Sequence, residues 1–429
     1  MNYSKLYADK KASVNDCLAL IHSGDIICFG GDCNEPKEIS SHLHEIADHV
    51  ENVVCYKPRT GEEAYLTSPG MDGHINTRGF FYGPGWRKGH VFGNCSYIPC
   101  DLSDYAKFSI EHKRPSVFIS AVSPMDEEGN FCNGLSLMWE KEMIACCDRI
   151  ILEVNPALPR VCGGLKINIR DVTALIEVDY PPETIEVREA SPEEIRVAQN
   201  VRSLMRDGDC IQLGIGTLPN AIANECMDLK DLGLHTEMAT STMGEMIRKG
   251  VITGARKNIN PGEHIYSFAC GDEALYRTLG ENPACRIVPA SYGVNPMVIM
   301  QNDNMVSINT CIQVDLTGQI CAETIGPKQY SGSGGSFDYA YGALHAKGGR
   351  GIMAFTATTP KGLSKIKAFL DFGAAVTVPR AYADYIVTEY GIAAMRGRSV
   401  KERALQLISI AHPNFREDLK KEAEKLFYI

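Results

Sequence analysis

The sequence predicts an α/β protein made of two tandem related α/β domains with parallel-rich sheets. The first observation is a repeat: residues 20–30 (LIHSGDIICFG) align with residues 204–214 (LMRDGDCIQLG). A second pair of segments, 117–132 and 306–321, aligns in the same order, each with the Asp and Gly spacing of a tight turn. The third observation is a set of continuous apolar runs, such as residues 149–154, typical of parallel strands covered on both faces by helices.

Within the repeat, each element has a local cause. In both copies a helix ends at a Gly-Asp pair, a short apolar strand follows, and a glycine-containing turn leads into the next helix. A proline, Pro36 in the first copy and Pro219 in the second, opens that helix, where a missing N–H removes no hydrogen bond. The repeat therefore predicts the same succession of elements in each domain.

Further elements are predicted outside the repeat. Apolar runs at residues 374–378 and 385–389 predict two more strands. Residues 399–402 (SVKE) form a capping box that begins a helix. After Pro413, the apolar side chains fall on one helical stripe, which predicts a core-packed helix at the end of the chain.

The domain organisation follows from the length and from the repeat. A chain of 429 residues favours two domains, and we expect them to span residues 1–187 and 188–429. The stretch 181–189 is rich in proline and charge, as linkers are.

Composition excludes several classes of protein. Apolar residues make up 44% and charged residues 22%, so the chain can bury large cores and is not disordered. The net charge of −10 argues against partners such as nucleic acid or a membrane surface, because both require a basic face. Any polyanionic ligand must therefore be held by a local site.

The expected location is cytoplasmic. No apolar run reaches the length of a membrane-spanning helix, and the first ten residues lack the apolar segment of a signal peptide. The 16 cysteines are scattered, many of them in apolar strands, and we interpret them as reduced and buried. None forms a Cys-x-x-Cys pair, so no metal site is expected.

The most informative stretch is the glycine turn in residues 212–222 (QLGIGTLPNAI), where a strand enters a turn and then a helix. Such a turn exposes backbone N–H groups to an anion or an oxyanion. The turn also imitates a dinucleotide fingerprint, but Pro219 stands where the third glycine is needed. A purely structural turn is the remaining alternative.

A short strand after this turn delivers Glu237 among uncharged neighbours, at the strand's carboxyl end. Ligands bind at such ends in open α/β sheets. Glu237 is therefore either a hydrogen-bonded buried acid or a catalytic group, and its position in the strand following the glycine turn favours the second.

Two later motifs are further candidates. Residues 328–338 (KQYSGSGGSFD) place Gly332, Gly334 and Gly335 where a backbone could approach a ligand closely, although the segment also fits a flexible loop. Residues 387–391 end a strand at Glu389, which is either an ion-pair or cap residue or part of the site.

Together these motifs, with residues 123–129 and 153–156, make the chain resemble the acetyl-CoA hydrolase/transferase family over its whole length. The resemblance is greatest to the 4-hydroxybutyrate CoA-transferases and butyryl-CoA:acetate CoA-transferases. It implies two tandem α/β domains of related fold, which agrees with the repeat.

The resemblance also implies roles for individual residues. Glu237 would attack an acyl-CoA thioester and form an acyl-glutamyl anhydride, which the released CoA thiolate converts into a glutamyl-CoA thioester. The oxyanion donors and CoA-binding groups would come from two glycine segments, and the substrate-carboxylate region would include Glu389. These segments comprise Gly214, Ile215, Gly216, Thr217, Leu218, Gly332, Gly334 and Gly335.

The partners implied are an acyl-CoA and a short-chain carboxylate, with CoA as substrate and covalent intermediate and no permanently bound cofactor. A homodimer or higher homo-oligomer is expected. The acyl group stays open, because residues 240–242 (TST) replace an acidic segment common in relatives, while Cys162-Gly163-Gly164 resembles the butyryl type. The alternatives are an acyl-CoA hydrolase that uses the same glutamate, an NAD-dependent oxidoreductase and a non-catalytic binding module.

Overall fold

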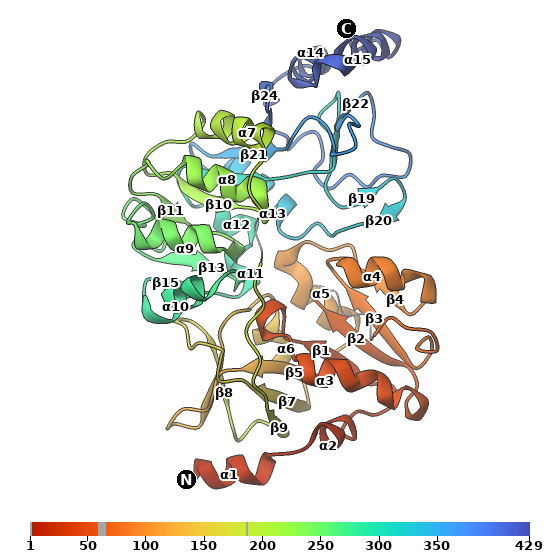
Figure 1. Ribbon diagram of the computed structural model, residues 1–429, viewed down its shortest axis with the longest axis vertical. Coiled ribbons are helices and arrows are strands. Elements are labelled where there is room, and N and C mark those ends of the chain that lie inside the picture. Colours follow the sequence, from red (N-terminus) through yellow and green to blue (C-terminus); the bar gives the residue numbers. More distant parts are fainter. Residues whose placement is uncertain (1, 59–65, 186–187) are drawn as a thin grey trace. The chain divides into compact units, whose positions relative to one another are not determined.

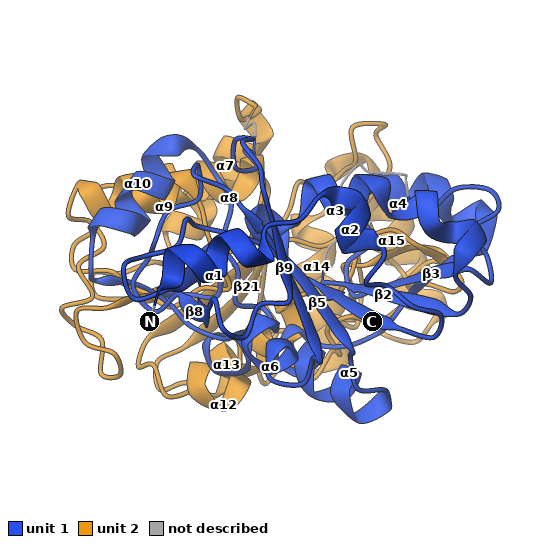
Figure 2. Ribbon diagram, turned by 90° about the horizontal axis from the view of Figure 1, so that it is seen from below, with its two compact units in different colours: residues 1–185, 265–293 blue, residues 186–264, 294–429 orange. Residues whose placement is uncertain are grey.

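Two parallel-rich sheets form the centres of two structural units (Figures 1 and 2). The computed structural model describes residues 2–58, 66–185 and 188–429. Unit 1 comprises residues 1–185 and 265–293, and unit 2 comprises residues 186–264 and 294–429. The α/β class with parallel-rich sheets is confirmed. Among the described helices, none combines the length and apolar character needed to cross a membrane.

The sheet of unit 1 has the strand order β4-β3-β2-β1-β5-β7-β9, and each neighbouring pair is parallel. Along this order the chain starts at β1 and proceeds outward in both directions. The strands are β1 (Ile26–Phe29), β2 (Val53–Lys57), β3 (Ile75–Gly79), β4 (Cys95–Tyr97), β5 (Val117–Val122), β7 (Arg149–Val154) and β9 (Ala174–Glu177).

One face of this sheet is covered by an apolar cluster, because alternate strand residues point to it. Helices α2 and α3 supply Leu18 and Ile39, which pack with Ile27 and Ile119 of the strands. The helices of unit 1 include α1 (Tyr3–Lys10), α2 (Val14–Leu18), α3 (Lys37–His42), α4 (Pro84–Gly89), α5 (Tyr105–His112), α6 (Glu140–Ile144) and α10 (Glu273–Glu281).

Residues 265–293 belong to unit 1 although they lie far along the chain from its other residues. The Leu137 N–H donates to the Ser267 carbonyl at 2.8 Å, and the Ala269 N–H donates to the Leu135 carbonyl at 2.9 Å. These backbone hydrogen bonds fix the segment against unit 1, so the units are not two uninterrupted halves of the chain. The domain boundary expected at residue 187 lies outside the described residues, because 186–187 are not described.

The sheet of unit 2 has the order β11-β10-β16-β21-β23-β24. Its first five strands are parallel, and β24 forms an antiparallel hairpin with β23. The strands are β10 (Cys210–Leu213), β11 (Gly233–Leu234), β16 (Met305–Asn309), β21 (Arg350–Ala354), β23 (Tyr385–Thr388) and β24 (Gly391–Ala394).

Helices cover both faces of this sheet. Ile352 and Ala354 of β21 belong to the core beneath α7, α8 and α9, whereas Met353 packs into a second core with α13, α14 and α15. In Figure 1, α7 and α8 lie side by side, and α14 and α15 end the chain. These helices are α7 (Pro192–Arg202), α8 (Thr217–Glu225), α9 (Ser241–Arg248), α13 (Ser336–His345), α14 (Val400–Ile410) and α15 (Pro413–Lys425).

The predicted repeat is confirmed by equivalent backbone hydrogen bonds. The Gly30 N–H donates to the Ile119 carbonyl at 2.9 Å in unit 1, and the Gly214 N–H donates to the Ile308 carbonyl at 2.9 Å in unit 2. These bonds join β1 to β5 and β10 to β16. The two halves of the aligned repeat therefore occupy the same places in their sheets.

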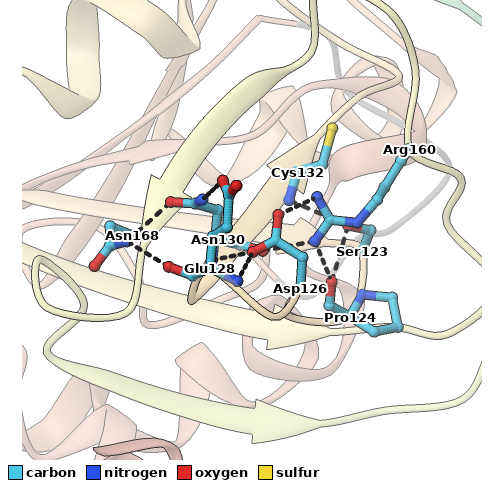
Figure 3. A network of polar contacts seen from close by, with 8 residues as sticks. All are labelled: Ser123, Pro124, Asp126, Glu128, Asn130, Cys132, Arg160 and Asn168. Carbon is cyan, nitrogen blue, oxygen red and sulfur yellow. Dashed lines mark hydrogen bonds and ion pairs between the residues drawn. The ribbon is translucent and has the colours of Figure 1, made fainter. Parts of the chain in front are cut away.

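The aligned tight turns are also equivalent. Figure 3 shows the first, in which Oδ1 of Asp126 accepts the N–H groups of Glu128 at 3.0 Å and Asn130 at 2.8 Å. Arg160 contacts the other carboxylate oxygen at 3.1 Å. In unit 2, Oδ1 of Asp315 accepts the N–H groups two and four residues further on in the same way. This motif therefore holds a turn in place.

Near the end of the chain, one expectation is wrong and others are confirmed in full or in part. Residues 374–378 do not form a strand; of these, Val378 makes an isolated bridge to Ile320. The strand that pairs with β21 is β23, from the neighbouring apolar run. The capping box is present, with Ser399 and Glu402 at the start of α14. The predicted stripe is confirmed in part: α15 buries Leu419 and Ala423, whereas Phe415 is half-buried and Leu426 follows the helix and is exposed.

Candidate functional site

Among the predicted site residues of unit 2, Gly214, Glu237 and Glu389 follow the carboxyl ends of its parallel strands β10, β11 and β23. β10 has β11 on one side and β16 on the other, and the chain proceeds outward from β10 in both directions. Such a topological switch point leaves a crevice at the carboxyl ends, where open α/β sheets bind ligands. The turn after β10 begins at Gly214, and Asn309 ends β16.

The glycine turn leads directly into α8. Gly216 has a φ of +115° and a ψ of −173°, a conformation that L-residues rarely adopt, and α8 begins at Thr217. The first N–H groups of a helix have no partner within the helix, so the Thr217 and Leu218 N–H groups mark a helix N-terminus suited to negative charge. Residues 214–217 are half-buried, so a ligand can reach the turn.

Glu237 lies in a bend between β11 and β12 (Met238–Ala239) and is half-buried. Its Oε2 accepts the Gly335 N–H at 2.9 Å. Gly335 is the N-cap of α13, so the carboxylate sits at the N-terminus of that helix, where negative charge is stabilised. The structure thus brings together two motifs that lie 98 residues apart in the sequence.

The approach of Gly335 to the carboxylate requires glycine. A Cβ atom at residue 335 would overlap Oε2 of Glu237 and would lie 2.8 Å from Cγ1 of Val294. The requirement is steric, since the backbone at Gly335 has an ordinary φ of −89°. The segment before it is an ordered turn in which Gly334 has a φ of +52°, and Gly332 and Gly334 are both buried.

Tyr339 borders the same carboxylate and was not predicted from the sequence. It is fully buried on α13, one helical turn after Gly335. Burial, and then the negative charge of Glu237, raise the pKa of Tyr339 well above its ordinary value, so its phenol stays neutral. The spacing of four residues from Gly335 would have revealed it, had α13 been recognised as starting at the glycine.

Asn309 is a second polar residue that sequence reasoning missed. Its Oδ1 accepts a hydrogen bond from Gln212 Nε2 at 3.1 Å, and its Nδ2 donates to Ser307 Oγ at 3.0 Å. A Cβ on Gly214 would lie 3.5 Å from the Asn309 Oδ1. The amide network therefore lies against the start of the glycine turn.

Glu389 is not brought together with Glu237. Its Oε2 accepts the Ala357 N–H at 2.8 Å, which ties the carboxyl end of β21 to that of β23. Three strands separate β23 from β11, a span of roughly 19 Å at the usual strand spacing. Glu389 also acts on the ammonium group of Lys365. Burial lowers the pKa of Lys365, and the negative charge of Glu389 is one of the charges that oppose this lowering.

The site offers no cluster of side chains that could bind a metal ion, among the residues that the structure describes. Within residues 2–58, 66–185 and 188–429, no three His, Cys, Asp or Glu side chains gather in a way that could hold a metal ion. The Glu237 carboxylate lies at the N-terminus of α13. The strand next to β11 is β10, which leads to the N-terminus of α8. Such an arrangement can place a nucleophile near donors for an oxyanion.

Comparison with known proteins identifies the class. Residues 1–190 match the acetyl-CoA hydrolase/transferase N-terminal domain, and residues 271–423 match the C-terminal domain of that family. The chain therefore belongs to the acetyl-CoA hydrolase/transferase family, and its activity is CoA transfer. Among its relatives, a 4-hydroxybutyrate coenzyme A transferase of Clostridium kluyveri is 35% identical over 100% of both chains.

A further relative and a solved structure are similar to this chain over almost its whole length. A butyryl-CoA:acetate CoA-transferase of Anaerostipes caccae is 36% identical, with 99% of this chain and 98% of the relative covered. The crystal structure of RipA from Yersinia pestis has a TM-score of 0.94 and 33% identity, with 100% of each chain covered. The fold of this chain therefore matches that of a solved structure over the full length of both chains.

Proposed function

We propose that this protein moves CoA between a short-chain acyl-CoA, of the butyryl or 4-hydroxybutyryl type, and a carboxylate such as acetate, with Glu237 as the nucleophile. The observation that supports this most is the hydrogen bond from the Gly335 N–H to Oε2 of Glu237. It holds a half-buried carboxylate at the sheet edge where ligands bind.

The first half of the reaction loads the enzyme. The Glu237 carboxylate attacks the thioester carbonyl, the C–S bond breaks, and an acyl-glutamyl anhydride and CoA thiolate form. The thiolate then attacks the glutamyl carbonyl, releasing the donor's carboxylate and leaving a glutamyl-CoA thioester. An incoming carboxylate reverses these steps and leaves as its CoA ester.

Each of these additions passes through a tetrahedral oxyanion. The N–H groups of Thr217 and Leu218 at the start of α8 are our candidates for donors to the acyl oxyanion. The Gly335 N–H, already on Oε2 of Glu237, would serve the oxyanion formed on the glutamyl carbon itself. One such donor contributes roughly 3 to 4 kcal/mol to transition-state stabilisation in other acyl-transfer enzymes.

We propose Glu389 as part of the substrate-carboxylate region within this function. Its bond to the Ala357 N–H and its distance from Glu237 place it at the far end of the same sheet edge. CoA enters as substrate and covalent intermediate, with no permanently bound cofactor. We further propose that the enzyme is cytoplasmic and works as a homo-oligomer. Light scattering of the purified protein would test the oligomeric state.

A substrate panel tests this function against its rivals. Butyryl-CoA, 4-hydroxybutyryl-CoA and other short-chain donors are each mixed with acetate, and the products are separated. Acetyl-CoA is expected, in an amount equal to the carboxylate released. Free CoA in place of acetyl-CoA would identify an acyl-CoA hydrolase. Turnover that requires NAD would identify the oxidoreductase alternative. If no product forms at all, the remaining alternative is a non-catalytic binding module.

A further inference from the structure

A polar cavity of about 310 Å³ opens at the amino-terminal edge of the unit 2 sheet, opposite the edge that carries Glu237. It is lined by residues that begin β21 and β23 and by the connection from β24 to α14. Its charged lining consists of Arg350, Arg396, Arg398 and a single acid, Asp384. Three arginines and one aspartate therefore line the cavity.

The carboxylates that balance these arginines lie mostly away from the cavity. Arg350 pairs with Asp209, and Arg398 contacts Glu402 at 3.2 Å, but neither acid lines the cavity. Arg396 contacts Asp384 at 2.7 Å. Each arginine thus has a carboxylate partner and the local charge is balanced, but two of the three carboxylates lie outside the lining, so arginine donors predominate on the cavity surface.

Two of these arginines, Arg396 and Arg398, keep N–H donors available for a ligand. The side chains of Arg396 and Arg398 are each 49% exposed. Arg396 uses Nη2 for Asp384 and the Gly349 carbonyl, and within the described chain no acceptor contacts its Nε or Nη1. A guanidinium presents five N–H donors in a planar fork, a geometry that matches phosphate oxygens.

Comparison with unit 1 separates the fold-stabilising arginine from the others. Arg149 begins β7 and contacts Asp25 and the Leu20 carbonyl, as Arg350 contacts Asp209 and a leucine carbonyl. That pair is common to both units. Arg396 and Arg398 follow β24, a strand with no counterpart in the described sheet of unit 1. They are thus additions to the common fold.

We propose that this cavity is a binding site for a small phosphate-bearing anion, either inorganic phosphate or a phosphomonoester. The unused planar donors of Arg396, the exposed Arg398 and a volume at the lower end of the range for ligand sites all fit such an anion. The site is independent of the Glu237 chemistry, so its occupancy is measured by binding.

The first test is a calorimetric titration of the full chain with inorganic phosphate at low salt, without CoA. Saturable binding with a matching rise in the unfolding temperature is expected. Arg398→Gln removes one charge-assisted contact and should weaken binding about tenfold. The matched control is Arg196→Gln, since Arg196 is 50% exposed and makes a similar helix pair with Glu193. That variant should bind phosphate as the wild type does.

A second variant fills the cavity without changing charge. Ala394 is half-buried in the cavity wall, so Ala394→Leu should abolish phosphate binding while the unfolding temperature without ligand changes little. A parallel titration with glycerol 3-phosphate separates the two sources: tighter binding than phosphate identifies a phosphomonoester site. Absence of saturable binding of either anion to the wild type, or unchanged binding in both Arg398→Gln and Ala394→Leu, would overturn the proposal.

Discussion

The two units share a strand plan but carry different residues at equivalent positions. β1 and β2 pair in the same parallel register as β10 and β11. Following that register to the strand ends puts Pro58 of unit 1 where unit 2 has Glu237. The turn position occupied by Gly216 in unit 2 is Asp32 in unit 1, and both residues have positive φ, at +115° and +44°. The strand register is shared by the two units, whereas the carboxylate at this position occurs in unit 2 and not in unit 1.

The surroundings of the two turns differ as well. In unit 1 the Gly31 N–H donates to Oε1 of buried Glu140 at 2.9 Å, and Lys57 forms a buried ion pair with Glu35. Residues 30–36 are buried throughout. In unit 2, residues 214–217 stay half-buried, which leaves the turn open to a ligand. The turn is therefore enclosed in unit 1, whereas in unit 2 it is accessible to a ligand.

The largest expected effect comes from removing the group that unit 1 lacks. Glu237→Gln keeps the shape and the acceptor for the Gly335 N–H but cannot act as a nucleophile. We expect the rate of CoA transfer to fall by at least about 10⁴-fold, as when other catalytic nucleophiles are removed. Initial rates of acetyl-CoA formation measure this.

Glu245→Gln is the matched control. Glu245 lies on α9 in the same unit, where it is paired with Lys249 at 2.7 Å on the surface. It should transfer CoA at the wild-type rate. A Glu237→Gln enzyme with near wild-type turnover and normal folding would show that the difference between Pro58 and Glu237 has no catalytic meaning.

The second prediction concerns the close approach at Gly335. Gly335→Ala places a methyl group against Oε2 of Glu237 and should move the carboxylate, costing about 10²-fold in kcat, since small displacements of reacting groups have effects of this size. Gly351→Ala, in β21 of the same unit, is the control, because its Cβ would make an ordinary 3.7 Å contact with the Ala340 carbonyl oxygen. Equal rates for the two alanine variants would contradict the geometry.

The smallest expected effect lies in unit 1. Burial raises the pKa of Glu153 to about 7, although the Ile39 N–H and the Tyr180 hydroxyl donate to its carboxylate. The equivalent position in β21 of unit 2 is Ala354, which does not titrate. Because the folded pKa lies above the unfolded value, this group makes stability fall as pH rises from about 4.5 to about 7.

Glu153→Gln should therefore flatten the pH dependence of unfolding in that range, by on the order of 2 kcal/mol. Urea unfolding at a series of pH values measures the slope for wild type and variant. The same slope in both proteins would mean that Glu153 titrates normally in the folded state.

Sequence patterns were sufficient for features that depend on local or repeated order. The repeat indicated equivalent strands and turns, and Glu237 was identifiable because a short strand exposes it after the glycine turn. The contact between Glu237 and Gly335 needed the structure, since it depends on where α13 packs relative to β11. Residues 374–378 show the opposite failure: an apolar run says nothing of whether a place in the sheet is already filled.

Two other features also depend on long-range packing. Residues 265–293 join unit 1 through backbone bonds to residues 135–137, which no local pattern indicates. The distance of Glu389 from Glu237 follows from the strand order, and the sequence alone does not give that order. The three candidate motifs therefore fall into two groups: Glu237 and Gly335 are in contact, whereas Glu389 lies far from both along the sheet edge.

The most direct test of the central claim is an intact-mass measurement after incubation with acyl-CoA donor alone. The account predicts that CoA becomes attached to the protein as a thioester of Glu237, that hydroxylamine removes it, and that peptide mapping after borohydride reduction finds the change at that residue. The Glu237→Gln variant should carry no CoA. An unmodified wild-type protein, or CoA attached to a residue other than Glu237, would contradict the account.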